Sequence, residues 1–320
     1  MRALSVSTCL LFATLAHGQP TPPNAVRLTK YILGVADLDR SYAFYHALGL
    51  DLDNATALGR PNTLPDMLLK LVDVPAGTKF RNMMLKIPNA PFAVEVTEFS
   101  NLELRPVKPR IQDPGASLLV LAVGDVDAAL AIAKKAGAEV VTTGGAPVAG
   151  TGRAARAVTV KDPDGYYVEF AQPRGVPPGD GKAMGAAFGS VVEDSEKAAA
   201  FYRDQFGFTV KTSDLADASA NLGTPGAQIR TASATIPGTD LSWVFFDFKG
   251  VDRKPYSGRI PDPGARALGL QVHDIDAAVA AVKAAGGVSI TQGGSARLGG
   301  NGRVGFVRDP SGILVELAQP

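Results

Sequence analysis

Arginines recur at corresponding positions in two similar halves of this sequence, and they are its most regular candidates for chemistry. An arginine that faces a cleft can bind a carboxylate or a phosphate through two parallel hydrogen bonds. The simpler alternative is a structural ion pair, which we favour because such pairs are common. Arg110 with Glu98 is one expected pair, and its counterpart is Arg259 with Asp247. The recurring arginines are Arg81 with Arg230, Arg156 with Arg303, and Arg110 with Arg259.

The halves that carry these arginines are an internal duplication. The segment RIQDPGASLLVLAVGDVDAAL, which starts at Arg110, reappears 149 residues later as RIPDPGARALGLQVHDIDAAV. KDPDGYYVEFAQP likewise reappears as RDPSGILVELAQP at the end of the chain. A stretch rich in Pro and Gly at 174–183 separates the two copies and is typical of a linker. We therefore predict two domains, at 25–173 and 184–320.

Each half itself contains two units of one kind. An Asp follows an apolar, strand-like run and opens a helix-like run, where its side chain can cap the first turn. An acid two residues later complements the helix dipole. Alternating apolar and polar runs then predict about three strands, with tight turns at DPDG and DPSG. The capping acids and the second acids are Asp37 and Asp39, Asp125 and Asp127, Asp194 and Glu196, and Asp274 and Asp276.

The first residues, MRALSVSTCLLFATLAHGQP, form a separate segment. Arg2 precedes a short apolar run that ends in small residues, which predicts a secretory signal peptide at 1–18. The run is too short for a typical membrane span, although an uncleaved anchor is the alternative reading. Cys9, the sole cysteine, lies here, so the mature chain is expected to have no disulfide or thiolate site. We expect a periplasmic or secreted protein.

The charge balance excludes one class of partner. The chain has 32 Lys and Arg residues against 31 Asp and Glu residues, so no basic surface for nucleic acid is expected. After the N-terminal segment, no stretch is long and apolar enough to span a bilayer. We predict a small-molecule ligand, no nucleic acid, no membrane association after signal cleavage, and a monomer or homodimer.

The repeated motifs resemble those of the vicinal oxygen chelate superfamily, also called the glyoxalase/bleomycin resistance protein/dioxygenase family. The matching features are an Asp-capped helix that carries Phe-Tyr and ends at Gly, in 37–49 and 194–207, and the pattern [KR]DP-x-G-x-x-x-E, in 161–169 and 308–316. The resemblance implies an α+β fold in which four βαβββ modules pair into two domains with concave mixed sheets. In many members the cleft holds a divalent metal that binds vicinal oxygens of the substrate.

The resemblance also locates the metal ligands of the family, and this sequence departs from them. The later-strand ligand position carries Glu95, Glu169 and Glu316 in three of the modules. Neither His46 nor His273 falls on a ligand position. We therefore expect no metal, with the three glutamates as fallback donors. At the first-strand position, usually His or Gln and seven residues before the capping Asp, the sequence has Lys30, Leu118, Ala187 and Ala267.

Among the residues at the first-strand ligand position, Lys30 differs most from the family pattern, because a lysine carries a positive charge where the family binds a cation. A lysine desolvated in a cleft can become a base or a nucleophile. Alternatively, Lys30 pairs with Glu95 or Glu169 and so compensates a buried carboxylate. We favour the ion pair.

Two functions from different classes follow from these observations. The first is an exported member of the superfamily that binds a small molecule in one or both clefts, without a cofactor and with a degenerate metal site. The second is a metal-dependent lyase or dioxygenase that uses an altered carboxylate site. A third reading makes the clefts vestigial and the protein structural. The candidate ligand-binding residues are Lys30, Arg81, Glu95, Glu169, Arg156, Arg230, Arg303 and Glu316.

Overall fold

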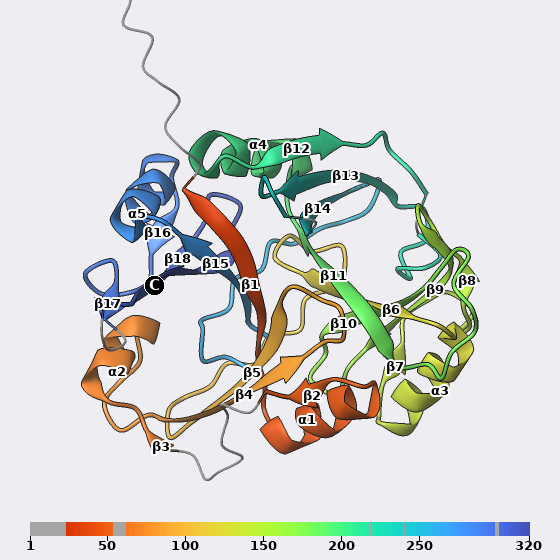
Figure 1. The fold of residues 1–320 in the computed structure, drawn as a ribbon, viewed down its shortest axis with the longest axis horizontal. Coiled ribbons are helices and arrows are strands. Elements are labelled where there is room, and N and C mark those ends of the chain that lie inside the picture. The colour runs from red at the N-terminus through yellow and green to blue at the C-terminus, as the bar shows by residue number, and fades with distance from the viewer. Residues whose placement is uncertain (1–23, 54–61, 218, 240, 298–300) are drawn as a thin grey trace, which may run out of the picture.

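The computed structural model describes residues 24–53, 62–217, 219–239, 241–297 and 301–320. The predicted signal peptide at 1–18 lies outside these residues. Within them, no helix is long and apolar enough to cross a membrane. The described chain forms the four successive modules that the sequence predicts, here called modules 1 to 4 (Figure 1).

The first half of the chain supplies modules 1 and 2. Module 1 comprises β1 (Ala25–Gly34), α1 (Leu38–Ala47), β2 (Asp51–Leu52), β3 (Asn62–Thr63), α2 (Asp66–Val72), β4 (Lys79–Lys86) and β5 (Ala93–Ser100). Module 2 comprises β6 (Ser117–Val123), α3 (Val126–Lys135), β7 (Glu139–Val140), β8 (Val148–Ala149), β9 (Ala154–Lys161) and β10 (Tyr167–Pro173).

The second half supplies modules 3 and 4. Module 3 comprises β11 (Ala183–Val191), α4 (Ser195–Phe206), β12 (Thr209–Thr212), β13 (Gln228–Thr235) and β14 (Ser242–Lys249). Module 4 comprises β15 (Arg266–Val272), α5 (Ile275–Ala284), β16 (Val288–Ser289), β17 (Ala296–Arg297), β18 (Arg303–Arg308) and β19 (Leu314–Gln319).

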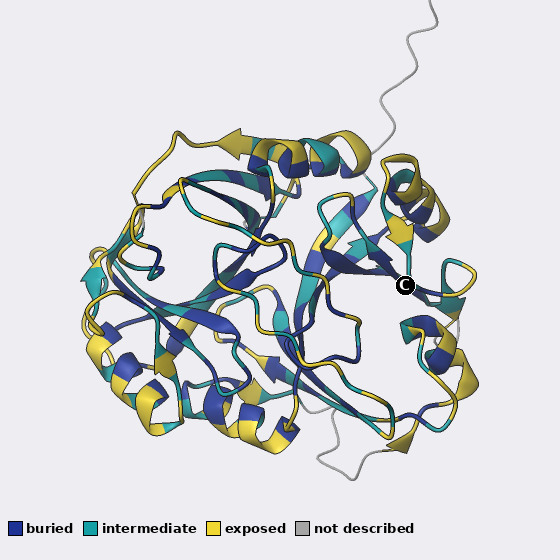
Figure 2. Cartoon of the chain, turned by 180° about the vertical axis from the view of Figure 1, so that it is seen from behind, coloured by how far each residue is buried: buried dark blue, intermediate teal, exposed yellow. Residues whose placement is uncertain are grey.

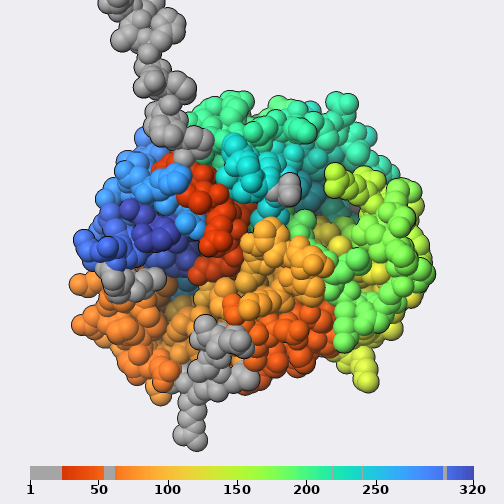
Figure 3. Space-filling model, in the orientation of Figure 1, coloured from red at the N-terminus to blue at the C-terminus, as the bar shows by residue number. Residues whose placement is uncertain are grey.

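The modules pair across the two halves. In the described part of the chain, sheet A has ten strands, in the order β16-β18-β19-β15-β1-β5-β4-β2 with β17 on β18 and β3 on β4. Sheet B has nine, in the order β12-β13-β14-β11-β6-β10-β9-β7 with β8 on β9. The joins are the antiparallel pairs β1–β15 and β11–β6. Module 1 therefore shares sheet A with module 4, and its red first strand lies against the blue end of the chain (Figures 1 and 3).

This pairing bears on the predicted division of the chain. Neither 25–173 nor 184–320 contains a whole sheet, because each sheet takes one module from each half. The two ranges describe the duplication in the sequence. The concave surfaces that could hold a ligand are made by modules that are distant in sequence or lie on both sides of the linker.

Four of the described helices, α1, α3, α4 and α5, begin where the capping acids predict, and α2 begins after Pro65 without a side-chain cap. Each cap accepts a hydrogen bond from a backbone N–H of the first turn, which satisfies a donor that has no partner within the helix. These four helices lie over the outside of the sheets, with buried faces inward and exposed faces outward (Figure 2). The cap bonds are Asp37 to Arg40 N, Asp125 to Asp127 N and Ala128 N, Asp194 to Lys197 N, and Asp274 to Ala277 N.

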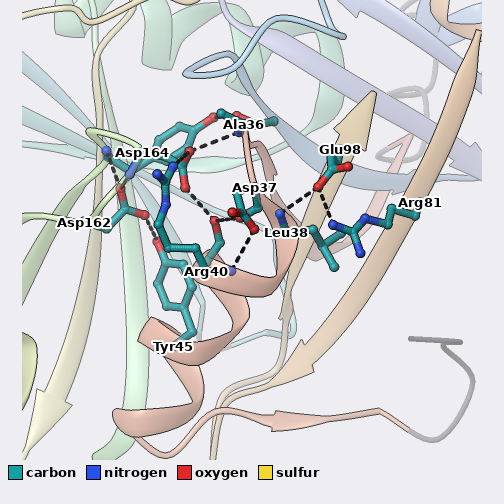
Figure 4. Close-up of polar contacts among 12 residues, drawn as sticks. Ala36, Asp37, Leu38, Arg40, Tyr45, Arg81, Glu98, Asp162 and Asp164 are labelled. Atoms are coloured by element: carbon teal, nitrogen blue, oxygen red, sulfur yellow. Dashed lines mark hydrogen bonds and ion pairs between the residues drawn. The ribbon is translucent and has the colours of Figure 1, made fainter. Parts of the chain in front are cut away.

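The Phe-Tyr helices are hydrogen-bonded to the DPxG turns of the following modules. Tyr45 Oη on α1 donates to Asp162 Oδ2 at 2.8 Å, and Tyr202 Oη on α4 donates to Asp309 Oδ2 at 2.8 Å. Asp164 accepts hydrogen bonds from Ala36 N and from the α1 side chains (Figure 4). Since modules 1 and 2 belong to different sheets, these buried bonds join sheet A to sheet B.

Candidate ligand-binding cavity

A cavity of about 270 Å³ lies on the concave face of sheet A. Its wall is mostly apolar, and a few polar groups stand along the central strands. This composition is typical of a small-molecule site. The apolar wall comes from Ile32, Leu64, Leu68, Leu71, Val72, Phe80, Phe99, Ile260, Val304 and Phe306, and the polar groups are Lys30, Asn82, Glu95, Thr97 and Glu316.

The polar side of the cavity centres on a lysine between two carboxylates. Lys30 Nζ lies 2.8 Å from Glu95 Oε2 and 2.8 Å from Glu316 Oε1. Asn82 Nδ2 donates to Glu95 Oε1 at 2.9 Å. The side chains of Lys30, Glu95 and Glu316 are 21%, 10% and 9% exposed, so the cluster is largely desolvated but still reachable from the cavity. We call Lys30, Asn82, Glu95 and Glu316 the lysine cluster.

Strand alternation and the cross-half pairing bring the lysine cluster together. Lys30 lies on β1, which has β5 with Glu95 on one side and β15 on the other. Glu316 lies on β19, the parallel neighbour of β15. Gly269 on β15 opposes Lys30, and a Cβ there would lie 2.5 Å from Lys30 Cγ. The missing side chain at Gly269 therefore leaves the space through which Lys30 reaches Glu316.

The carboxylates hold the lysine in its charged form. Burial by itself lowers the pKa of Lys30, but the charges and hydrogen bonds of Glu95 and Glu316 outweigh it and raise the pKa above its usual value. Burial raises the pKa of Glu316, and Lys30 partly offsets that rise. A protonated amine has no lone pair for nucleophilic attack or proton abstraction. The cluster can therefore bind and orient a ligand, with Lys30 as a fixed cation.

The sequence prediction for Lys30 is confirmed for one of its two partners. Lys30 pairs with Glu95, as predicted. Pairing with Glu169 is wrong, and Glu316 takes that place. The reason is the cross-half pairing, which puts module 2 with Glu169 into sheet B and module 4 with Glu316 into sheet A.

Glu169 occupies the corresponding place on sheet B, where packed side chains occupy the concave face. Asn221 Nδ2 donates to Glu169 Oε2 at 2.8 Å, and Leu222 packs against the sheet with Ile229 and Phe248. Burial raises the pKa of Glu169 to about 7, and the bond from Asn221 offsets only part of this rise. Glu169 thus has no cation beside it within the described residues and belongs to a filled counterpart of the sheet A cavity.

The recurring arginines lie away from the cavity and form ion pairs, as favoured from the sequence. Four of them bind the second acid of the helix in their own module. The specific partners predicted for Arg110 and Arg259 are wrong, because each folds back on the Asp three residues later. The observed pairs are Arg81 with Asp39 and Glu98, Arg156 with Asp127, Arg230 with Glu196, Arg303 with Asp276, Arg110 with Asp113, and Arg259 with Asp262.

Several lining residues were missed in the sequence, notably Asn82, Phe306 and those on α2. The signal for α2 was present: Pro65 stands before the first turn, and apolar residues follow at 68, 69, 71 and 72. Such spacing is typical of a helix with one apolar face. Asn82 carried no comparable signal, because an Asn on a strand is ambiguous until its neighbour Glu95 is known.

We predict that Lys30→Met lowers the free energy of unfolding by about 3–5 kcal/mol, because it leaves two carboxylates without their buried cation. The variant Lys30→Met with Glu95→Gln and Glu316→Gln should recover most of this loss. Urea unfolding monitored by circular dichroism measures both. Lys86→Met is the control, since Lys86 also has an acid at 2.8 Å but is 60% exposed. Equal losses for the two single variants would contradict the prediction.

Glu169 should make the stability depend on pH. Its pKa is raised from 4.5 to about 7 in the folded protein, because burial disfavours the charged form. The free energy of unfolding is therefore highest below pH 4.5, where Glu169 is protonated in both states, and it falls as the pH rises through 7. Glu169→Gln should match the parent near pH 4 and exceed it by about 2 kcal/mol at pH 8. Urea unfolding at both pH values, with the exposed Glu139→Gln as control, tests this. A gain that is the same at pH 4 and pH 8 would refute it.

Comparisons with known proteins agree with this architecture. Residues 27–170 and 186–317 match the family described as the Glyoxalase/Bleomycin resistance protein/Dioxygenase superfamily. Glyoxalase I from Zea mays superposes with a TM-score of 0.60 at 22% identity, over 92% of this chain and 92% of that one. A putative dioxygenase from Bacillus subtilis subsp. subtilis str. 168 superposes with a TM-score of 0.52 at 14% identity, over 93% and 86%. At these identities the likeness shows the fold. A search of curated proteins finds no match.

Proposed function

Because the chain belongs to the Glyoxalase/Bleomycin resistance protein/Dioxygenase superfamily, we propose that it is a small-molecule-binding member whose ligand occupies the sheet A cavity. The observation that carries this proposal is an apolar hollow of about 270 Å³ that ends on the lysine cluster. Drug-sized ligands occupy pockets of about 300–1,000 Å³. The ligand is therefore compact, about the size of a substituted ring.

The charge of the lysine cluster selects the polar group of the ligand. One lysine and two carboxylates carry one net negative charge when all are ionised. Carboxylate oxygens accept hydrogen bonds, and Lys30 is already paired with both glutamates. A ligand that donates a hydrogen bond, through a hydroxyl or an amine, therefore suits this end better than a carboxylate or a phosphate.

The metal of the superfamily does not suit the same residues. Glu95 and Glu316 offer two carboxylates, but the protonated Lys30 amine lies 2.8 Å from both and would repel a divalent cation. No group of three or more His, Cys, Asp and Glu side chains fit for a metal occurs among the residues described. We propose that the metal site is degenerate and that Lys30 supplies the positive charge.

A ligand panel on one ring tests the binding proposal. A phenol and a benzylamine should raise the melting temperature of the full chain, and the benzoate of the same ring should not. Leu68→Trp, which fills the cavity from α2, should abolish the rise. Leu215→Trp, at an exposed apolar site away from the cavity, should keep it. Preferential binding of the benzoate, or an unchanged response in Leu68→Trp, would overturn the proposal.

The degenerate metal site predicts a gain of function. Lys30→His should create a site with one imidazole and two carboxylates, and three protein ligands suffice for Zn²⁺. Calorimetric titration with Zn²⁺ should show binding to Lys30→His and none to the parent or to Lys30→Met. Stoichiometric binding by the parent protein would instead support the metal-dependent alternative.

We further propose export, supported by the signal-like segment at 1–18. N-terminal sequencing of protein recovered from the periplasm or the medium should begin at Gln19. Recovery of the protein in the cytoplasm with an intact N-terminus would contradict export.

A further inference from the structure

Arg266 is a half-buried arginine without a partner among the described residues. It opens β15 at the junction of the two sheets, and it lines three small cavities of about 10 Å³ each. No described residue accepts a hydrogen bond from its guanidinium or forms an ion pair with it, and its Nε is buried without a partner. An arginine does not lose its proton in a protein, so the charge persists. A charge that is partly removed from water without a partner is costly.

A second arginine lies in one of these cavities. Arg308 Nη1 donates to Gly312 O at 2.9 Å, and Nη2 donates to Gly258 O at 2.7 Å. Both acceptors are neutral carbonyls, and no described carboxylate forms an ion pair with Arg308. Burial lowers the pKa of both Arg266 and Arg308, and the charge of Arg266 lowers that of Arg308 further. Two cations therefore share one hollow whose described lining contains no acid.

The internal duplication supplies a comparison within the same molecule. In the corresponding cavity, Ser117 stands in place of Arg266, and Val107 in place of Tyr256. Ser117 shares a hydrogen bond with Tyr31, so its hydroxyl is satisfied. Lys161 is the counterpart of Arg308. Its Nζ lies 3.9 Å from Glu139 Oε1 and over the ring of Tyr167. Arg266 also lines this counterpart cavity, but a second arginine, Arg308, lines only the cavity on the module 4 side.

The volume limits what can neutralise these two cations. A hollow of about 10 Å³ has room for one water-sized particle. Phosphate, sulfate and carboxylate ligands are larger than that. A water molecule fits but carries no charge to offset two guanidinium groups. A monatomic anion such as chloride is only slightly larger than a water molecule and carries the charge that water lacks.

We propose that the cavity between Arg266 and Arg308 binds a halide ion, physiologically chloride, at the junction of sheet A and sheet B. Both guanidinium groups retain N–H donors that can reach such an ion. Gly115, in the turn before β6 of sheet B, lines the same cavity. The ion therefore stabilises the packing of module 4 against module 2, at a site separate from the ligand cavity.

Thermal unfolding of the full chain at constant ionic strength tests this, with sodium chloride replacing sodium gluconate. A halide that binds the folded state should raise the melting temperature by about 3 °C between 1 and 100 mM chloride, and above the dissociation constant the rise should follow the logarithm of the chloride concentration. Arg266→Met should lose this dependence. Arg303→Met is the control, because it removes one positive charge from an exposed ion pair with Asp276 and should keep the dependence.

A measurement on the unmodified protein covers the case in which Arg266→Met does not fold. Crystals grown in sodium bromide should show an anomalous scattering peak between Arg266 and Arg308. A melting temperature that is equal in chloride and gluconate would overturn the proposal. So would bromide crystals in which that position holds water.

Discussion

The pairing of β1 with β15 is the constraint on which the rest of this structure depends. It joins the first module to the fourth by an antiparallel ladder that runs from Ala25 to Leu33 on β1. The equivalent ladder between β6 and β11 joins the second module to the third. Once these strands pair, Lys30 can meet Glu95 and Glu316 but cannot meet Glu169. Of the polar groups in the cavity, Glu316 is supplied by this choice of neighbours, whereas the others belong to module 1 itself.

The two sheets are built from similar modules, but side chains fill their concave faces to different extents. On sheet A, α2 stands at the edge of a hollow and leaves it open. On sheet B, the segment around Asn221 and Leu222 packs into the corresponding face and hydrogen-bonds Glu169. A buried carboxylate needs a partner in either case. On sheet A the partner is the charged Lys30, and on sheet B it is the amide of Asn221. A charged cluster that a ligand can reach is therefore present on sheet A.

The two sheets are held together largely by groups that also recur. The tyrosines of the Phe-Tyr helices reach the aspartates of the DPxG turns across the boundary between sheets. Burial raises the pKa of Asp162 to about 7 and that of Asp309 to about 6, and the tyrosine bonds work against that rise. The repeated motifs are thus part of the scaffold, whereas the residues that distinguish the modules, such as Lys30 and Arg266, mark the candidate sites.

The sequence by itself determined the local features: the capping acids, the four modules, the turns and the ion-pair character of the recurring arginines. The caps and turns follow from interactions between residues close in the chain, such as Asp37 with Arg40 N, and most of the arginine pairs form within a single module. Tertiary structure alone decided that Glu316, rather than Glu169, joins Lys30, and that Arg266 stays unpaired among the described residues. Two similar copies of a module offer nearly the same strand edges, so local sequence does not say which copies pair. Packing of whole sheets decides that, and with it the composition of each site.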